Sequence, residues 1–237
     1  MLRSLNQLYG IKLGASDGEI GHLKDFYFDD RSWTVRYVVA DTGSWLPGRQ
    51  VLLSPHAFGS LHQVGRILNV NLTRKQIEES PSIQSHKPVS RQFEMEYYQY
   101  YGWPCYWQGD ALWGASAFPI VEQPAKSAPG EPAPFLGPQP ERPDAHLRST
   151  KAVTGYHIHA GGQTVGHICD FMMAGQSWAI RQMVVKVGHR FSGKEVQIPT
   201  TQVDRISYDE STVHVNLTGD AVAKSPEHHL APVGAAD

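Results

Sequence analysis

The sequence predicts an all-β protein built from two copies of one small domain, and two observations predict it. When the 237-residue chain is compared with itself at an offset of 145 positions, 22 of the 80 positions from Leu2 to Pro81 are identical, without a gap, to those from Leu147 to Pro226. Each copy also consists of short runs with alternating apolar and polar residues, separated by turn-forming residues. We therefore expect a duplicated β unit, and two small β-barrels that each end in a short helical turn.

The repeat divides the chain into four parts. We expect a first domain over residues 1–82, a connecting part over 83–145, a second domain over 146–227 and a frayed tail over 228–237. The connecting part opens with an aromatic segment, residues 97–113, which carries eight aromatic side chains. It continues into a proline-rich stretch with seven prolines from Pro124 to Pro143, and this composition predicts an extended linker.

Within the first copy, β-branched and aromatic residues with period-two alternation predict four strands. These strands are Glu19–Asp29, Trp33–Asp41, Gln50–Leu53 and Arg66–Leu72. A short helical turn is expected to follow, because Thr73 is a good N-cap residue and Gln76 stands three residues later. Pro81 would then end the helical turn.

The polar turn after Phe28 predicts a hairpin between the first two strands. Pairing Phe28 with Trp33 places Asp25 opposite Arg36, as a cross-strand ion pair on one face. The other face would form the core, from Phe26, Phe28, Trp33, Val35, Tyr37 and Val39. The second copy repeats the scheme with Asp170 opposite Arg181, and with Phe171, Met173, Trp178, Ile180 and Val184 inward. Alternatively, the carboxylate and the guanidinium of each pair could bind a ligand. Both copies place the pair on the same hairpin face, which favours a structural role.

Charge, cysteine content and hydropathy narrow the classes of function that this protein is expected to have. With 21 basic and 23 acidic residues the net charge is −2, and the charges are spread evenly, so no basic excess favours nucleic acid binding. Cys105 and Cys169 stand at non-equivalent positions without zinc-like spacing, so we expect neither a disulfide nor a zinc site. No signal-peptide pattern and no apolar run of about 20 residues is present. We therefore expect a cytoplasmic protein without a transmembrane segment, and leave peripheral membrane association open.

The twelve histidines are candidate ligands for a metal ion. His157 and His159 alternate along an expected strand, and His22 and His167 are repeat equivalents, but no third ligand stands at a recognisable spacing. The chain also lacks the serine-hydrolase elbow, the phosphate-binding loop and the dinucleotide-binding glycine pattern. We therefore expect no metal, no cofactor and no enzymatic activity.

The first copy resembles PRC-barrel domains. The resemblance rests on the stretches Gly18–Phe26, Asp29–Gly43, Trp45–Arg49 and Val51–Pro55. The second copy keeps Gly166, Asp170-Phe171, Trp178, Arg181 and Gly193, but has residues 189–192 in place of Trp45-Leu46-Pro47. The run Tyr100–Trp107 is similar to an aromatic tail that follows such domains in bacterial proteins. Relatives include the cytoplasmic domain of the photosynthetic reaction centre H subunit and the C-terminal domain of a ribosome maturation factor, so the resemblance implies the fold and an adaptor role.

The expected function is therefore that of a non-enzymatic adaptor that binds a protein partner. The expected contact residues are large apolar side chains at a turn and in the aromatic segment, namely Trp45, Leu46, Tyr100, Tyr101, Trp103, Tyr106 and Trp107. The aromatic segment could instead fold back and cap a barrel, or do both. Two alternatives stay open: a module that binds a small molecule, a metal or a tetrapyrrole, and a ribosome-associated factor. The two barrels could also pack on each other, within a chain or in a homodimer.

Overall fold

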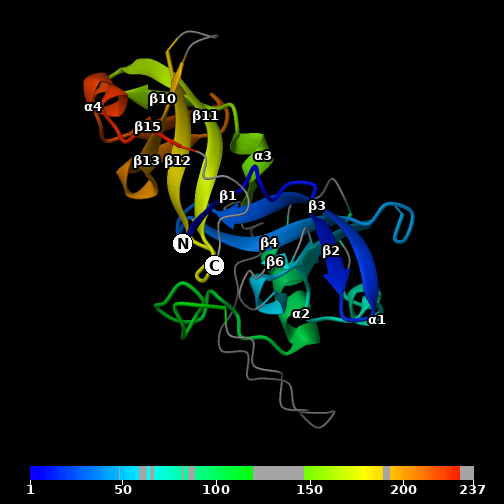
Figure 1. The fold of residues 1–237 in the computed structure, drawn as a ribbon. Coiled ribbons are helices and arrows are strands. Elements are labelled where there is room, and N and C mark those ends of the chain that lie inside the picture. The colour runs from blue at the N-terminus through cyan, green and yellow to red at the C-terminus, as the bar shows by residue number, and fades with distance from the viewer. Residues whose placement is uncertain are drawn as a thin grey trace. The chain divides into compact units, whose positions relative to one another are not determined.

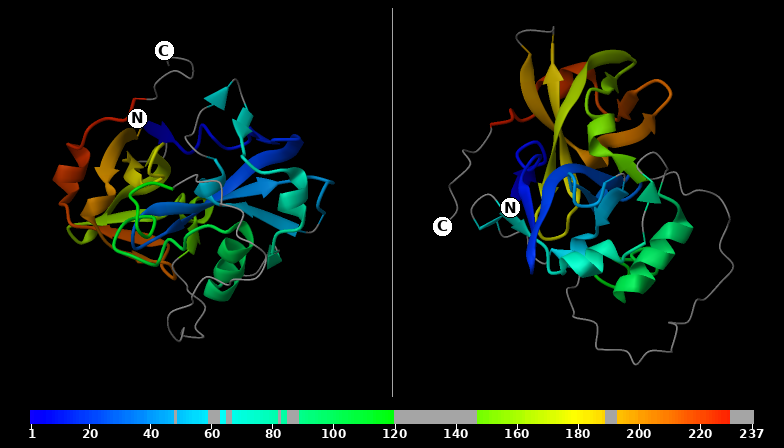
Figure 2. Two further views of the ribbon diagram at one scale, coloured as in Figure 1. Left: turned by 90° about the horizontal axis from the view of Figure 1, so that it is seen from below. Right: turned by 90° about the vertical axis from the view of Figure 1, so that its right-hand side faces the viewer.

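A computed structural model describes residues 1–47, 49–58, 63–64, 67–81, 83–84, 89–119, 147–188 and 193–229. The proline-rich stretch, Gly48 and residues 230–237 lie outside the described residues. The described part is mostly β-sheet with few helices, which confirms the all-β class. The chain forms two compact units, shown in Figure 1 and Figure 2, and neither is one continuous stretch of sequence.

Unit 2 comprises residues 8–149 and 175–178. Its strands are β2 (Lys12–Ala15), β3 (Gly18–Asp29), β4 (Thr34–Asp41), β5 (Arg49–Leu53), β6 (Gln63–Val64), β7 (Ile67–Asn69), β8 (Ile83–Gln84) and β9 (Leu147–Ser149). They form one eight-stranded sheet in the order β6-β7-β2-β3-β4-β5-β8, to which β9 adds by pairing with β3. A 3-10 helix (Pro55–Ala57) and the helices α1 (Arg74–Glu78) and α2 (Arg91–Tyr101) complete it, and both views in Figure 2 show α2 beside these strands.

Unit 1 comprises residues 1–7, 150–174 and 179–237. Its strands are β1 (Leu2–Ser4), β10 (His157–Ala160), β11 (Gln163–Ala174), β12 (Ile180–Val187), β13 (Lys194–Pro199), β14 (Val203–Ser207) and β15 (Thr212–Val215). They form a seven-stranded sheet in the order β13-β12-β11-β10-β15-β14, with β1 paired to β11. The helices are α3 (Thr150–Val153), α4 (Gly219–Ala223) and a 3-10 helix (Thr200–Gln202). In Figure 1, β11 and β12 run side by side as the long ribbons of this unit.

The two sheets follow the same strand order at corresponding positions of the repeat. The series β2, β3, β4 and β5 corresponds to β10, β11, β12 and β13, and in both sheets the first of these strands pairs in parallel with a late strand, β7 or β15. The expected helical turn is confirmed as α1, where Thr73 and Gln76 form a reciprocal capping box. In each unit, the paired strands among the described residues form an open series that begins and ends with an edge strand.

The register of the central hairpin differs from the expected one. β3 and β4 pair with Phe28 opposite Val35 and Asp25 opposite Val39, so Asp25 does not face Arg36. The turn has the expected length but is shifted by one position, because Asp29 lies opposite Thr34 and Trp33 belongs to the turn, in the left-handed region at φ 52°. Arg36 is the extra residue of a register shift between Tyr27 and Phe28, which is a β-bulge that re-aims its side chain.

The expected core residues are buried in both copies, which confirms them. Within β4, however, the residues from Thr34 to Ala40 are all buried, including those on the face expected to be polar. A strand that is buried on both faces needs a second covering layer. In unit 2 that layer includes the aromatic segment, whose Tyr97, Tyr98 and Trp113 are almost completely buried.

The compact units differ from the expected boundaries of 1–82 and 146–227. Residues 1–7 belong to the unit formed mainly by the second repeat, because β1 pairs with β11. Residues 147–149 belong to the unit formed mainly by the first repeat, because β9 pairs with β3. Residues 175–178, at the tip of the β11–β12 hairpin, also belong to unit 2. Strand pairing, rather than sequence order, therefore decides the membership of these short segments.

Candidate functional site

The aromatic segment is anchored to unit 2 by α2. This helix begins after Ser90, whose hydroxyl accepts a hydrogen bond from Phe93 N, and ends at Gly102, which takes the left-handed conformation at φ 68°. Tyr97 donates its hydroxyl hydrogen to Leu52 O at 3.0 Å, and the Tyr98 hydroxyl lies 3.3 Å from Ser54 Oγ. The helix thus turns its tyrosines toward β5 and the residue after it, and these hydroxyls find partners inside the unit.

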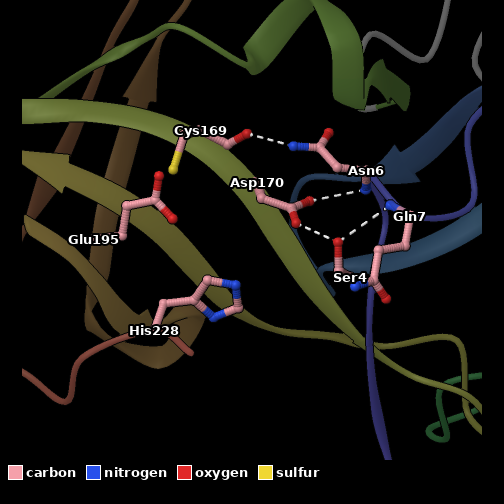
Figure 3. A pocket seen from close by; sticks show the side chains of 7 residues that line it. All are labelled: Ser4, Asn6, Gln7, Cys169, Asp170, Glu195 and His228. Carbon is pink, nitrogen blue, oxygen red and sulfur yellow. Dashed lines mark hydrogen bonds between the residues drawn. The ribbon is translucent and has the colours of Figure 1, made fainter. Parts of the chain in front are cut away.

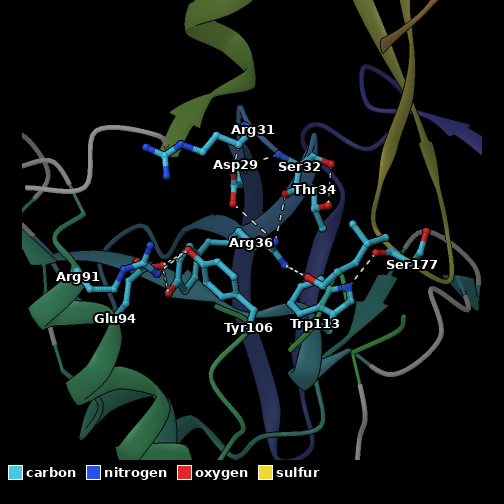
Figure 4. A network of polar contacts seen from close by, with 12 residues as sticks. Asp29, Arg31, Ser32, Thr34, Arg36, Arg91, Glu94, Tyr106, Trp113 and Ser177 are labelled. Carbon is cyan, nitrogen blue, oxygen red and sulfur yellow. Dashed lines mark hydrogen bonds and ion pairs between the residues drawn. The ribbon is translucent and has the colours of Figure 1, made fainter. Parts of the chain in front are cut away.

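Arg36 is the centre of the polar network in Figure 4. Its side chain is 3% exposed, and its guanidinium lies 3.6 Å from the Asp29 carboxylate. It donates to Leu112 O at 2.5 Å and to Ser32 Oγ at 3.1 Å. The guanidinium also lies 3.8 Å from the centre of the Tyr106 ring, a cation–π contact. A buried charge of this kind is tolerated because it is paired and hydrogen-bonded.

A second buried charge, Glu94 of α2, completes the network. It is 0% exposed, and it accepts hydrogen bonds from Tyr37 Oη at 3.0 Å and from Tyr106 Oη at 2.8 Å. Arg91 lies 3.0 Å from the same carboxylate. Burial and the adjacent Glu94 carboxylate raise the pKa of Tyr37 and of Tyr106, so both phenols stay protonated and donate. Tyr106 therefore links the two charge pairs, because its ring faces Arg36 and its hydroxyl binds Glu94.

Residues 175–178, at the tip of the β11–β12 hairpin, contact the same part of unit 2. Trp113 Nε1 donates to Ser177 O at 2.9 Å, which Figure 4 shows beside Arg36. Val35 N donates to Trp178 O at 2.9 Å, and the Trp178 ring lies 5.3 Å from that of Phe58. Trp178 has a φ of 59°, a strained conformation for a bulky residue. The aromatic segment therefore helps to form the site that binds this turn of the second repeat. We call this site, which includes Trp113, Val35 and Phe58, the hairpin receptor.

The expected ion pairs Asp25–Arg36 and Asp170–Arg181 are corrected by these contacts. Arg36 pairs with Asp29, while Asp25 accepts a hydrogen bond from Ser149 Oγ at 2.5 Å. Asp170 likewise accepts from Ser4 Oγ at 2.5 Å. Arg181 is exposed. The physical reason is local, since the position equivalent to Asp29 is Ala174, which has no charge to hold Arg181.

The expected partner-binding residues divide into buried and accessible ones. Tyr101 and Tyr106 are 7% and 4% exposed and belong to the interior of unit 2. Four are half-buried, and only one of the seven, Tyr100, is well exposed, at 40%. The half-buried residues are Trp45, Leu46, Trp103 and Trp107. Trp103 stacks on Tyr101 with ring centroids 4.4 Å apart, so it is held in place by the interior residues.

Helix α1 brings the two expected parts of the partner site together. The Arg74 guanidinium lies 4.6 Å from the centre of the Trp45 ring. On the same helix, Gln76 O accepts hydrogen bonds from Tyr100 Oη at 3.0 Å and from Tyr101 Oη at 3.4 Å. Residues that stand more than 50 positions apart in the sequence, Trp45 and Tyr100, therefore both contact α1.

Unit 1 contains a pocket of about 270 Å³. As Figure 3 shows, the Asp170 carboxylate and the His228 ring point into it, with Glu195 on the same side as His228. The remaining lining residues are Ser4, Asn6, Gln7 and Cys169. His228 was expected in a frayed tail, but it is only 9% exposed, and its backbone N donates to Glu195 O at 2.8 Å.

The polar groups of this pocket include a buried histidine nitrogen and a thiol whose pKa is raised. The Gln197 amide lies 2.9 Å from His228 Nδ1, and an amide N–H that donates there leaves the ring proton on Nε2. Nε2 is buried and has no hydrogen-bond partner among the described residues. Burial raises the pKa of the Cys169 thiol to about 12, and the Glu195 and Asp170 carboxylates act in the same direction. A thiol with this pKa is not a nucleophile at neutral pH.

The histidines do not gather into a metal site in the described part of the chain. No group of three or more potential ligands is present among those residues. His159 and His214 stand opposite each other on β10 and β15, with ring centroids 5.3 Å apart. His159 Nε2 lies 2.7 Å from Thr164 Oγ1, so this ring is engaged by a hydroxyl.

Sequence reasoning missed three features of these sites. One is Asp29, whose replacement by Ala174 in the second copy is a signal that the comparison of the copies contains. The others are Ser4 of β1 and Ser149 of β9, and Trp113 as the residue that binds the hairpin tip. Comparison with known proteins adds no assignment, since no protein-family model matches the chain and no match was found among curated proteins. No helix in the described residues is long and apolar enough to cross a membrane.

Proposed function

We propose that this chain is a non-enzymatic adaptor with two PRC-barrel-like units, and that unit 2 binds a protein partner. The proposed contact area is the α1 surface, which we define as Trp45, Leu46, Arg74 and Tyr100. Tryptophan, tyrosine and arginine are the residues that contribute most binding energy at protein interfaces. This surface combines all three with a neighbouring apolar side chain.

One observation carries the proposal: two accessible aromatic residues from distant parts of the sequence are fixed on one short helix. Tyr100 is 40% exposed although its hydroxyl is bonded to Gln76 O, so the ring is held in an orientation that leaves it accessible. Trp45 is half-buried under the Arg74 guanidinium. Arg49 further fixes the C-terminal end of α1 by donating to the carbonyl oxygens of Ile77, Glu78 and Ser80. A preorganised aromatic pair loses little side-chain entropy on binding.

The chemistry of the buried groups supports an adaptor over an enzyme. Arg36 and Glu94 are engaged by neighbours in the interior of unit 2. Burial raises the pKa of the Cys105 thiol to about 11, and the Cys169 thiol reaches about 12. Neither cysteine therefore offers a thiolate at neutral pH.

Affinity capture with matched variants tests the proposal. The wild-type chain, Trp45→Ala and Tyr100→Ala are compared with Phe118→Ala, which removes another aromatic side chain of unit 2 that is 50% exposed. We expect a protein captured from a lysate of the source cells to be retained by Phe118→Ala and reduced at least about tenfold by the other two variants. Equal capture by all four proteins, or capture by none, would contradict the proposal. Intrinsic fluorescence spectra of each variant verify that unit 2 is folded.

The pocket of unit 1 supports a second candidate function, the binding of a small organic cation. The observation in its favour is the buried Nε2 of His228, which has no partner in the described structure, in a pocket that the Asp170 and Glu195 side chains also line. A ligand with an ammonium group and a hydroxyl acceptor would satisfy both kinds of group. Calorimetric titration with ethanolamine tests this, with Glu195→Gln and His228→Ala as variants. Heat that persists unchanged in both variants, or no heat with the wild type, would exclude this site.

A further inference from the structure

The first strands of the two repeats have the same sequence and occupy each other's places. β1 is Leu2-Arg3-Ser4 and β9 is Leu147-Arg148-Ser149. β1, from the first repeat, pairs with β11 of the second, and β9, from the second repeat, pairs with β3 of the first. The registers are equivalent, since Leu2 lies opposite Ala174 and Leu147 lies opposite Asp29, which corresponds to Ala174 at the offset of the repeat.

The same side-chain bond fastens both strands. Ser4 Oγ donates to Asp170 Oδ2 at 2.5 Å, and Ser149 Oγ donates to Asp25 Oδ2 at 2.5 Å. In each case the other carboxylate oxygen accepts from the next backbone N–H, at 2.7 Å from Phe171 and at 2.8 Å from Phe26. A hydroxyl bound to a carboxylate is a strong, charge-assisted hydrogen bond. This explains why the Asp-Phe pair is present in both repeats, where sequence reasoning had assigned the aspartates to ion pairs.

We propose that the Leu-Arg-Ser strand and the edge beside the Asp-Phe pair form an interchangeable donor and acceptor, so that each repeat is built to exchange its first strand with another copy of itself. The pairing is a β-strand addition, in which backbone bonds give affinity and one side chain gives specificity. Within a chain the exchange is reciprocal between the two repeats. The partner that each acceptor edge fits is therefore a second repeat, supplied by the same chain or by a second copy of it.

The three-residue strands do not themselves select one acceptor over another, because both are identical and both acceptors offer the same aspartate geometry. What favours the partner repeat of the same chain is covalent linkage, which gives the donor a high effective concentration. When chains refold at a concentration that competes with this linkage, the same contacts form between chains, as in domain swapping.

Paired cysteines test the exchange in the full chain. In a Cys105→Ser, Cys169→Ser background, Leu2→Cys is combined with Ala174→Cys, a pair that is directly opposite on β1 and β11. Antiparallel partners have Cα atoms about 4.5–5.5 Å apart, which suits a disulfide. The matched control combines Leu147→Cys with the same Ala174→Cys, and it would crosslink only if the second repeat used its own first strand. We expect rapid disulfide formation in the first variant and at least about tenfold slower formation in the control, followed by mass spectrometry of the digested protein.

A second measurement does not depend on cysteines. A protease site is inserted within residues 120–146 of the otherwise native chain, and the cut protein is passed over a gel-filtration column. We expect the two fragments to co-elute, because each unit contains strands from both fragments, and we expect Ser4→Ala with Ser149→Ala to lower the concentration range over which they stay together. Fragments that elute separately, or a control disulfide that forms as fast as the exchanged one, would overturn the reciprocal exchange.

Refolding tests the second copy as partner. The Leu2→Cys, Ala174→Cys variant is unfolded in urea and refolded at about 1 μM and at about 1 mM, using an equal mixture of chains with two different tags. We expect disulfide-linked pairs carrying both tags to increase with concentration, and to form in Leu147→Cys, Ala174→Cys as well, because the two donor strands have the same sequence. If no mixed pair forms at the higher concentration, the exchange is confined to a single chain and the partner assignment is wrong.

Discussion

Replacing Arg36 by alanine gives the sharpest test of the polar network in unit 2. The change removes a guanidinium that is paired with Asp29, bonded to Leu112 O and placed over the Tyr106 ring. The chain offers a matched control at Arg181, the equivalent residue of the second repeat, which is exposed. The two substitutions remove the same atoms at equivalent positions of the repeat, so their difference measures the environment alone.

The structure sets the size of the expected effect. Removing one partner of a buried ion pair costs about 3–5 kcal/mol, because the remaining charge is left without compensation. The Tyr106 contact adds about 1–2 kcal/mol. Two features reduce the sum, since Asp29 keeps hydrogen bonds from Arg31 N and Ser32 N, and Arg36 Nε has no hydrogen-bond partner among the described residues. We expect Arg36→Ala to lower the free energy of unfolding by about 4 kcal/mol, and Arg181→Ala to change it by less than about 0.5 kcal/mol.

Tryptophan fluorescence measures this loss in the relevant unit. All six tryptophans of the chain belong to unit 2 by residue number, so their emission during urea denaturation follows that unit. Arg181 belongs to unit 1, so amide hydrogen exchange in β12 measures the unfolding free energy of Arg181→Ala. An Arg36→Met variant keeps most of the side-chain volume and separates the electrostatic loss from the cavity. The reasoning fails if Arg36→Ala and Arg181→Ala have unfolding free energies within 1 kcal/mol of each other.

Three further predictions concern the hairpin receptor, Asp170 and the thiols. Trp113→Phe should destabilise unit 2 by about 1–2 kcal/mol more than Trp107→Phe in fluorescence-detected urea titrations, because Trp113 Nε1 donates to Ser177 O whereas Trp107 Nε1 has no partner among the described residues; equal losses would exclude the receptor role. Burial raises the pKa of Asp170 against its hydrogen bonds, so its contribution to stability is present below the unfolded pKa and is lost as pH rises through the folded pKa. The wild type should therefore gain stability over Asp170→Asn as pH falls from 7 to 4, measured by amide hydrogen exchange in β11, and a constant difference would contradict this. With pKa values of about 11 and 12, Cys105 and Cys169 should react with iodoacetamide at pH 8 at least about 100-fold more slowly in the native chain than in urea, and similar rates would refute the assigned burial.

The elements that sequence predicted well are those governed by local rules. The capping box at Thr73 and Gln76 depends on residues three positions apart, and the inward residues of β3 and β4 follow from period-two alternation. The register was wrong by contrast, because it depends on a bulge at Arg36 and on the left-handed conformation of Trp33. A tryptophan rarely adopts that conformation, so residue type alone gave no reason to expect Trp33 within the turn.

The candidate sites were less predictable because they depend on segments that are remote in sequence. The composition of the aromatic segment indicated its importance, but whether Tyr101 or Tyr106 would be buried depends on how α2 meets β5. The aspartates kept in both repeats were the right residues to single out. Their partners, Ser4 and Ser149, lie 166 and 124 positions away, beyond what strand alternation can specify.

The differences between the repeats indicate where a partner would distinguish one unit from the other. The contacts that fasten the exchanged strands are the same in both, with serine bound to aspartate at 2.5 Å in each case. The α1 surface is not duplicated, because the positions equivalent to Trp45 and Leu46 are Arg190 and Phe191, and the segment that supplies Tyr100 follows only the first repeat. Contacts that hold the exchanged strands have to be kept in both copies of the repeat. A binding surface, by contrast, needs to be complete in only one copy. A partner that requires Trp45 and Tyr100 together would therefore bind unit 2 and leave unit 1 without a competing site.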